Sequence, residues 1–85
     1  MIRFDYVVTD KEGIHARPAG VLVQEAKKYA CSISLENKGK TVDAKRLLAV
    51  MSLAAKCGEK ITVTCNGEGE EKAAEALKVF FTENL

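Results

Sequence analysis

The sequence predicts an α+β fold of two layers, in which helices cover one face of a sheet. Segments with alternating apolar and polar residues, typical of half-buried strands, are interspersed with segments whose apolar residues recur every three or four positions, typical of amphipathic helices. Two strand segments are joined by a short turn, which predicts a hairpin. The resulting order, β-α-β-β-α-β-α, fits a mixed or antiparallel sheet. The pattern leaves the order of the strands open.

The first third of the chain predicts a strand, a turn and a helix. Apolar residues occupy every second position over residues 2–8, and a polar turn follows over residues 9–13. Apolar spacings of three and four predict a helix over residues 17–29. Pro18 suits the first turn of this helix because its missing N–H has no partner there.

The middle of the chain predicts a hairpin. Residues 31–36 alternate between apolar and polar side chains, and Asn37-Lys38-Gly39 is a tight-turn signal. Residues 40–43 are therefore expected to return as a short strand beside residues 31–36.

The last part predicts a helix, a strand and a final helix. Residues 47–54 form a short, unusually apolar helical segment that is expected to end near Gly58. Residues 61–65 alternate and predict the fourth strand. Acidic residues open the final helix, where they favour the positive end of the helix dipole. The side chains that this helix is expected to bury are Ala73, Ala74, Leu77, Val79, Phe80 and Phe81.

Length and composition predict a single domain over residues 1–85. The chain is 47% apolar and 29% charged, as in ordinary soluble proteins, and its net charge of +1 argues against a dedicated nucleic-acid binder. No apolar run approaches the roughly 20 residues that span a bilayer. Asp5 interrupts the position where a signal peptide would need an apolar segment. We therefore expect a cytoplasmic protein without membrane insertion.

The three cysteines do not predict a metal site or disulfides. They lack C-x-x-C spacing, and the sequence has one histidine, so the usual zinc ligand sets are missing. Cys31 and Cys65 fall on inward-facing strand positions and are expected to be buried, whereas Cys57 is expected to be exposed. We expect neither a metal nor a cofactor, and unpaired thiols fit a reducing compartment.

The segment Gly13-Ile14-His15-Ala16-Arg17-Pro18-Ala19 predicts chemistry on a phosphoryl group. His15, the only histidine, lies where the strand pattern gives way to the helix pattern, beside the free N–H groups of the first turn. An imidazole is a neutral nucleophile near physiological pH, and Arg17 is placed to contact the oxygens of a phosphoryl group on the ring. A lone histidine is more often a plain core or surface residue. The residues alone therefore leave both interpretations open.

The same segment resembles the active-site signature of HPr, the phosphocarrier family of the bacterial phosphoenolpyruvate-dependent sugar phosphotransferase system. The resemblance extends over essentially the whole chain without evident gaps. Further matching segments are Val23-Gln24-Glu25-Ala26, Lys38-Gly39-Lys40, Leu47 through Leu53, and Gly67-Glu68-Gly69-Glu70-Glu71.

This resemblance implies both a fold and a function. The implied fold is an open-faced sandwich with an antiparallel sheet in the order 1-4-2-3 and three helices on one face. The implied function is a phosphocarrier in which Nδ1 of His15 accepts a phosphoryl group from enzyme I and donates it to enzyme IIA domains of sugar permeases. Arg17 and the backbone N–H groups of Ala16 and Arg17 would orient the phosphoryl oxygens. Such a chain is a substrate of transferases with a phosphohistidine intermediate, and it is not an autonomous enzyme.

The resemblance also implies a docking surface beside His15 for enzyme I and IIA domains. Leu48 and Met51 are expected to be exposed, while Leu47, Val50 and Leu53 divide between core and surface. Two interpretations stay open for the basic side chains of Arg17, Lys27, Lys45 and Arg46: a rim around this surface that complements acidic partner faces, or plain solvated charges. The predicted docking residues are Gly20, Gln24, Lys27, Arg46, Leu47, Leu48 and Met51.

Arg46 departs from the family pattern. The family commonly carries a serine here, which HPr kinase/phosphorylase modifies in many Gram-positive bacteria, and arginine has no hydroxyl to modify. A regulatory protein that signals to other proteins by the phosphorylation state of His15 therefore stays an alternative to the general carrier. A small interaction domain with an incidental histidine is a third alternative. Nothing in the sequence requires more than a monomer.

Overall fold

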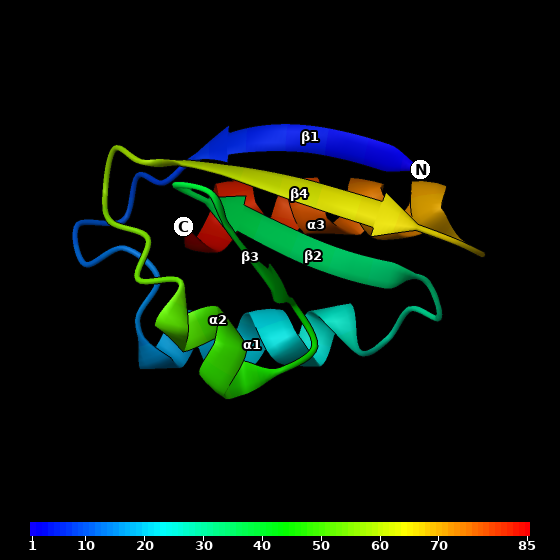
Figure 1. Cartoon of the computed structure of the whole chain (residues 1–85), viewed down its shortest axis with the longest axis horizontal. Coiled ribbons are helices and arrows are strands. Elements are labelled where there is room, and N and C mark those ends of the chain that lie inside the picture. Colours follow the sequence, from blue (N-terminus) through cyan, green and yellow to red (C-terminus); the bar gives the residue numbers. More distant parts are fainter.

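The computed structural model describes all 85 residues, and four strands alternate with three helices in the expected order (Figure 1). No helix is both long enough and apolar enough to cross a membrane. The elements are β1 (Ile2–Val7), α1 (Ala16–Ala26), β2 (Ser32–Asn37), β3 (Lys40–Asp43), α2 (Leu47–Ser52), β4 (Lys60–Asn66) and α3 (Glu70–Asn84).

The sheet is antiparallel throughout, with the strand order β1-β4-β2-β3. Its register pairs Phe4 with Val63 and Leu35 with the same Val63 on the other side of β4. Side chains on alternate positions of β2 and β4 are buried, so one face of the sheet is covered by the helices while the other faces solvent. The predicted two-layer α+β fold and the strand order implied by the HPr resemblance are both confirmed.

One core lies between the sheet and the helices. It contains 23 contiguous buried residues, among them Leu22 of α1, Val50 of α2 and Phe81 of α3. Cys31 and Cys65 are 2% and 0% exposed, as their strand positions predicted. Burial raises the pKa of the Cys65 thiol to about 11, which keeps this thiol protonated and unreactive.

The prediction that Val79 belongs to the core was wrong. Val79 is 53% exposed, whereas Leu77, Phe80 and Phe81 are buried. In a helix of 3.6 residues per turn, the buried side chains at spacings of three and four form one stripe along α3. Val79 lies two positions after Leu77, and therefore on the opposite side of the helix.

Two predicted helix ends were also wrong. The first helix ends at Ala26 and not at residue 29, and α2 ends at Ser52 and not near Gly58. Ala54 has a φ of +52°, a left-handed conformation that no continuing α-helix contains. Residues 53–59 form a loop that leads into β4 and packs against the loop between β1 and α1.

Candidate functional site

His15 is the N-cap residue of α1. Its φ of −111° and ψ of −173° are extended, and no side chain caps the helix. The N–H of Ala19 donates to the carbonyl oxygen of His15 at 2.9 Å, so the N–H groups of Ala16 and Arg17 precede the first intrahelical bond. The side chain of His15 is 36% exposed. The imidazole therefore combines access to solvent with a place at the positive end of a helix.

Gly13 makes the sharp approach to His15 possible. Its φ is +69°, a backbone conformation that residues with a side chain rarely adopt. A Cβ at this position would lie 2.2 Å from the carbonyl oxygen of Ala55. The same oxygen accepts a hydrogen bond of 2.9 Å from the N–H of Ile14. The backbone of the loop after α2 thus touches the backbone that carries His15.

The loop between β1 and α1 is also fixed by hydrogen bonds near its start. The N–H groups of Thr9 and Asp10 both donate to the carbonyl oxygen of Leu85, which follows α3. Gly58 donates its N–H to the carbonyl oxygen of Val8 at 2.8 Å. Two segments far away in the sequence, residues 53–59 and Leu85, therefore fix the path of residues 8–15, and the backbone of His15 is well anchored.

The ring of His15 borders a surface pocket of about 340 Å³. Arg17 is exposed and lines the same pocket, as expected for a residue that contacts an anion bound near His15. The predicted pair of His15 and Arg17 is therefore brought together. The lining residues are Asp10, Glu12, His15, Arg17, Pro18, Val21 and Asn84.

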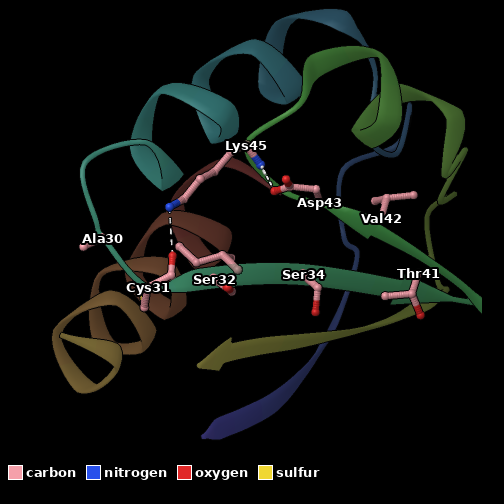
Figure 2. A pocket seen from close by; sticks show the side chains of 9 residues that line it. Ala30, Cys31, Ser32, Ser34, Thr41, Val42, Asp43 and Lys45 are labelled. Carbon is pink, nitrogen blue, oxygen red and sulfur yellow. Dashed lines mark hydrogen bonds between the residues drawn. The ribbon is translucent and has the colours of Figure 1, made fainter. Parts of the chain in front are cut away.

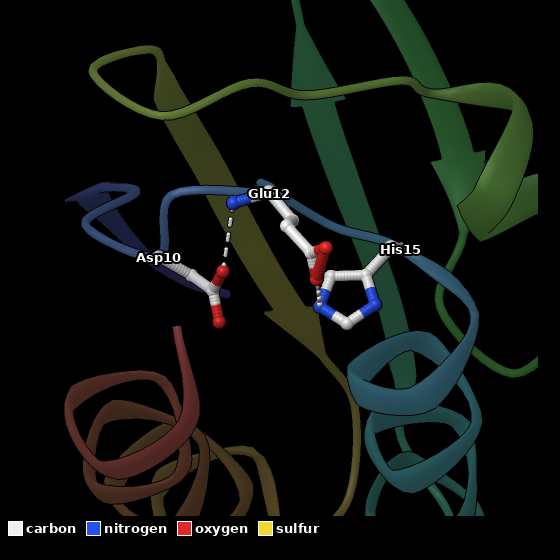
Figure 3. Close-up of side chains that lie close together, drawn as sticks. All are labelled: Asp10, Glu12 and His15. Atoms are coloured by element: carbon white, nitrogen blue, oxygen red, sulfur yellow. Dashed lines mark hydrogen bonds and ion pairs between the residues drawn. The ribbon is translucent and has the colours of Figure 1, made fainter.

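Glu12 and Asp10 are site residues that the sequence reasoning missed (Figure 3). Oε1 of Glu12 lies 3.4 Å from Nε2 of His15, and Oδ1 of Asp10 accepts a hydrogen bond of 2.9 Å from the N–H of Glu12. The sequence placed both acids in a polar turn. The sequence signal was Gly13 itself: glycine readily adopts a positive φ, and such a turn lies between Glu12 and His15.

A larger pocket, of about 400 Å³, lies elsewhere, beside β2 and β3 (Figure 2). The polar groups of this pocket hydrogen-bond to one another and so stabilise the fold. Nζ of Lys45 donates to the carbonyl oxygens of Tyr29 and Cys31 at 2.7 and 2.8 Å. Oδ1 of Asp43 accepts from the N–H of Lys45 at 2.9 Å. The expectation that Lys45 rims a docking surface was therefore wrong, because its ammonium group is bound at this edge of the sheet.

The apolar residues of α2 divide as the sequence suggested. Val50 is 0% and Leu53 5% exposed, whereas Leu47, Leu48 and Met51 are 43%, 80% and 38% exposed. We call these three exposed residues the α2 patch. α1 and α2 contact each other, so the patch lies near the helix that begins at His15 (Figure 1). The other predicted docking residues are Gly20, which is half-buried, and Gln24, Lys27 and Arg46, which are exposed.

Two further side chains were singled out by the sequence. Arg46 is the N-cap residue of α2, where no side-chain hydrogen bond caps the helix. Cys57 is exposed, and its thiol lies 3.7 Å from the carbonyl oxygen of Thr9.

Comparison with known proteins decides the family. Residues 2–83 match the family described as the HPr component of the phosphotransferase system, phosphorylation site. The chain belongs to the HPr family. The phosphocarrier protein HPr of Mycoplasma capricolum is 38% identical over 78 residues, which cover 92% of this chain and 88% of that protein.

Solved structures of similar proteins superpose on this chain. A histidine-containing phosphocarrier protein from Mycoplasma superposes with a TM-score of 0.94 at 35% identity, covering 96% of this chain and 93% of that one. Crh of Bacillus subtilis, described as a domain-swapped dimer, superposes with a TM-score of 0.78 at 38% identity, covering 100% of this chain and 98% of that one. The chain is thus a phosphocarrier of the HPr family, similar to both HPr and Crh.

Proposed function

We propose that this HPr-family phosphocarrier accepts a phosphoryl group from enzyme I on His15 and donates it to enzyme IIA domains of sugar permeases. The observation that carries the proposal is the half-exposed imidazole at the uncapped start of α1, with Arg17 lining the same pocket. A helix start and a guanidinium both favour an added anion. Three free cysteines fit a cytoplasmic site of action.

In the proposed transfer, the lone pair of Nδ1 attacks phosphorus in line with the departing donor atom. The N–P bond forms while the bond from phosphorus to the donor breaks, and the electron pair of that bond stays with the donor. The N–H groups of Ala16 and Arg17 and the guanidinium of Arg17 then contact the phosphoryl oxygens. Catalysis of this kind depends on positioning and charge, and the partner supplies much of both.

The α2 patch is the proposed docking surface for both partners. Leu47, Leu48 and Met51 expose apolar side chains on one short helix, and exposed apolar patches mark interaction sites. Met51 has a flexible side chain that adapts to more than one partner. The cationic group of Arg46 at the start of α2 favours acidic partner faces, and an Arg46→Glu variant is expected to accept phosphoryl groups from enzyme I more slowly. An undiminished rate would remove this part of the proposal.

We further propose that the protein acts as a monomer. Crh, at 38% identity, is described as a swapped dimer, so the oligomeric state needs its own measurement. Sedimentation equilibrium of the pure protein is expected to give the mass of one chain. A mass of two chains would contradict the proposal.

The test of the function is incubation with phosphoenolpyruvate and enzyme I, followed by mass spectrometry. We expect the mass of one phosphoryl group, lost in acid and absent from a His15→Ala variant, followed by discharge onto a sugar-specific IIA domain. Arg17→Gln keeps a polar side chain but removes the charge, and it is expected to slow acceptance. Phosphorylation without discharge to any IIA domain would favour a regulatory role over sugar transport.

A further inference from the structure

The contact between Glu12 and His15 has a consequence for the chemistry of the ring. A neutral imidazole carries its proton on one nitrogen only, and the other nitrogen is the nucleophile. Oε1 of Glu12 lies 3.4 Å from Nε2, whereas Nδ1 lies on the side of the ring away from Glu12 (Figure 3). An ionised carboxylate only accepts hydrogen bonds, so it favours a proton on the nitrogen that it faces.

We propose that Glu12 is a positioning residue that holds His15 in the tautomer with the proton on Nε2, so that Nδ1 presents its lone pair to phosphorus. The start of α1 favours the same tautomer, because a helix N-terminus presents N–H donors and partial positive charge, which an N–H on Nδ1 would oppose. The inference deepens the proposed function, and only its effect on transfer rests on that function.

The position of Glu12 is built into the loop. Its N–H donates to Oδ1 of Asp10 at 2.9 Å, and the N–H of Gly13 donates to the carbonyl oxygen of Asp10 at 2.9 Å. Ile14, between Gly13 and His15, is 5% exposed and anchors the chain in the core. The backbone on both sides of the pair is therefore fixed, and small rotations of the two exposed side chains suffice to complete a hydrogen bond.

The same carboxylate also acts during transfer. When Nδ1 forms its bond to phosphorus, the ring gains one positive charge and keeps its proton on Nε2. Glu12 faces that charge and stabilises it, whereas Arg17 is free to contact the phosphoryl oxygens. The side chains of His15 and Glu12 are 36% and 73% exposed, so solvent weakens this attraction. We expect its loss to lower the rate of phosphoryl acceptance about two- to fivefold.

The test compares the native protein with Glu12→Gln. A glutamine side chain has nearly the same shape, but it both donates and accepts hydrogen bonds, so it no longer selects a tautomer. Glu75→Gln is the matched control, because Glu75 is exposed on α3 and lines no pocket with His15. Nitrogen-15 NMR of the His15 ring gives the share of each tautomer at about pH 8.5, where an ordinary imidazole is neutral. EDTA is added to each sample so that no metal ion binds to the carboxylates of Asp10 and Glu12 or to the imidazole of His15.

We expect the Nε2–H tautomer to dominate in the native protein and in Glu75→Gln, and the share of Nδ1–H to rise in Glu12→Gln. Glu12→Ala is the second variant and is expected to behave like Glu12→Gln. A tautomer ratio that is the same in the native protein and both Glu12 variants overturns the inference, whether or not His15 accepts a phosphoryl group. A shifted ratio in a protein that enzyme I never phosphorylates supports the inference and overturns the proposed function.

Discussion

Replacing Gly13 with alanine tests whether the backbone contact that positions His15 stabilises the fold. Two terms add. A φ of +69° is unfavourable for alanine by about 1–2 kcal/mol. The new Cβ would also lie 2.2 Å from the carbonyl oxygen of Ala55 and 2.9 Å from Cα of Lys56, so the two backbones must separate. Overpacking of this kind costs about 1–3 kcal/mol. We expect Gly13→Ala to lower the free energy of unfolding by about 2–5 kcal/mol.

The chain offers its own control for this prediction. Gly39 has a φ of +81°, yet a Cβ built on it has no atom within 4 Å. Gly39→Ala therefore carries the backbone term alone and is expected to lower the free energy of unfolding by about 1–2 kcal/mol. Urea unfolding followed by circular dichroism measures both variants. If Gly13→Ala is no less stable than Gly39→Ala, the close contact with Ala55 does not hold the loop and the reasoning is wrong.

Three further predictions concern single side chains. The pKa of Glu59 is lowered to about 2, first by the side chain of Lys38 and then by a backbone N–H. Because the folded pKa is below the ordinary 4.5, ionised Glu59 stabilises the protein above pH 4.5, and this stability is lost as pH falls towards 2. In urea titrations at several pH values, Glu59→Gln is expected to lose less stability than the native protein over that interval; equal losses would contradict the assignment. Lys45→Met leaves two backbone carbonyl oxygens without their donor and is expected to lower the free energy of unfolding by about 1–3 kcal/mol, whereas an unchanged urea midpoint would contradict that account. Leu48→Asp is expected to leave stability within about 0.5 kcal/mol of native but to raise the KM for phosphoryl transfer from enzyme I; an unchanged KM would exclude Leu48 from the docking surface.

Much of the fold could be predicted from local patterns. Alternation identified β1, β2 and β4, because one face of the sheet is buried and the other faces solvent, and the turn signal before residues 40–43 identified β3. The strand order came from the resemblance to HPr and not from the pattern, since pairing between β1 and β4 joins residues about sixty positions apart. The predicted helix ends were the least accurate part of the prediction. Ala54 adopts a positive φ, which an alanine in the sequence does not indicate.

The candidate site was predicted only in part. His15 and Arg17 were found because their side chains lie in one short segment at a helix start. Lys45 was misassigned as a surface cation, since its partners are carbonyl oxygens on a segment that becomes its neighbour only after folding. Glu12 was missed for a related reason: its contact with His15 depends on the positive φ of Gly13, beside which the N–H of Ile14 bonds to Ala55, a residue far along the chain.

We propose that His15 is the phosphoryl acceptor. The most direct measurement is NMR of the nitrogen-15-labelled protein after reaction with phosphoenolpyruvate and enzyme I, because coupling to phosphorus identifies the bonded nitrogen. We expect coupling on Nδ1 of His15, no phosphoryl group on any other residue, and loss of the signal when a IIA domain is added. An unmodified imidazole, or a phosphoryl group on any other side chain, would contradict it.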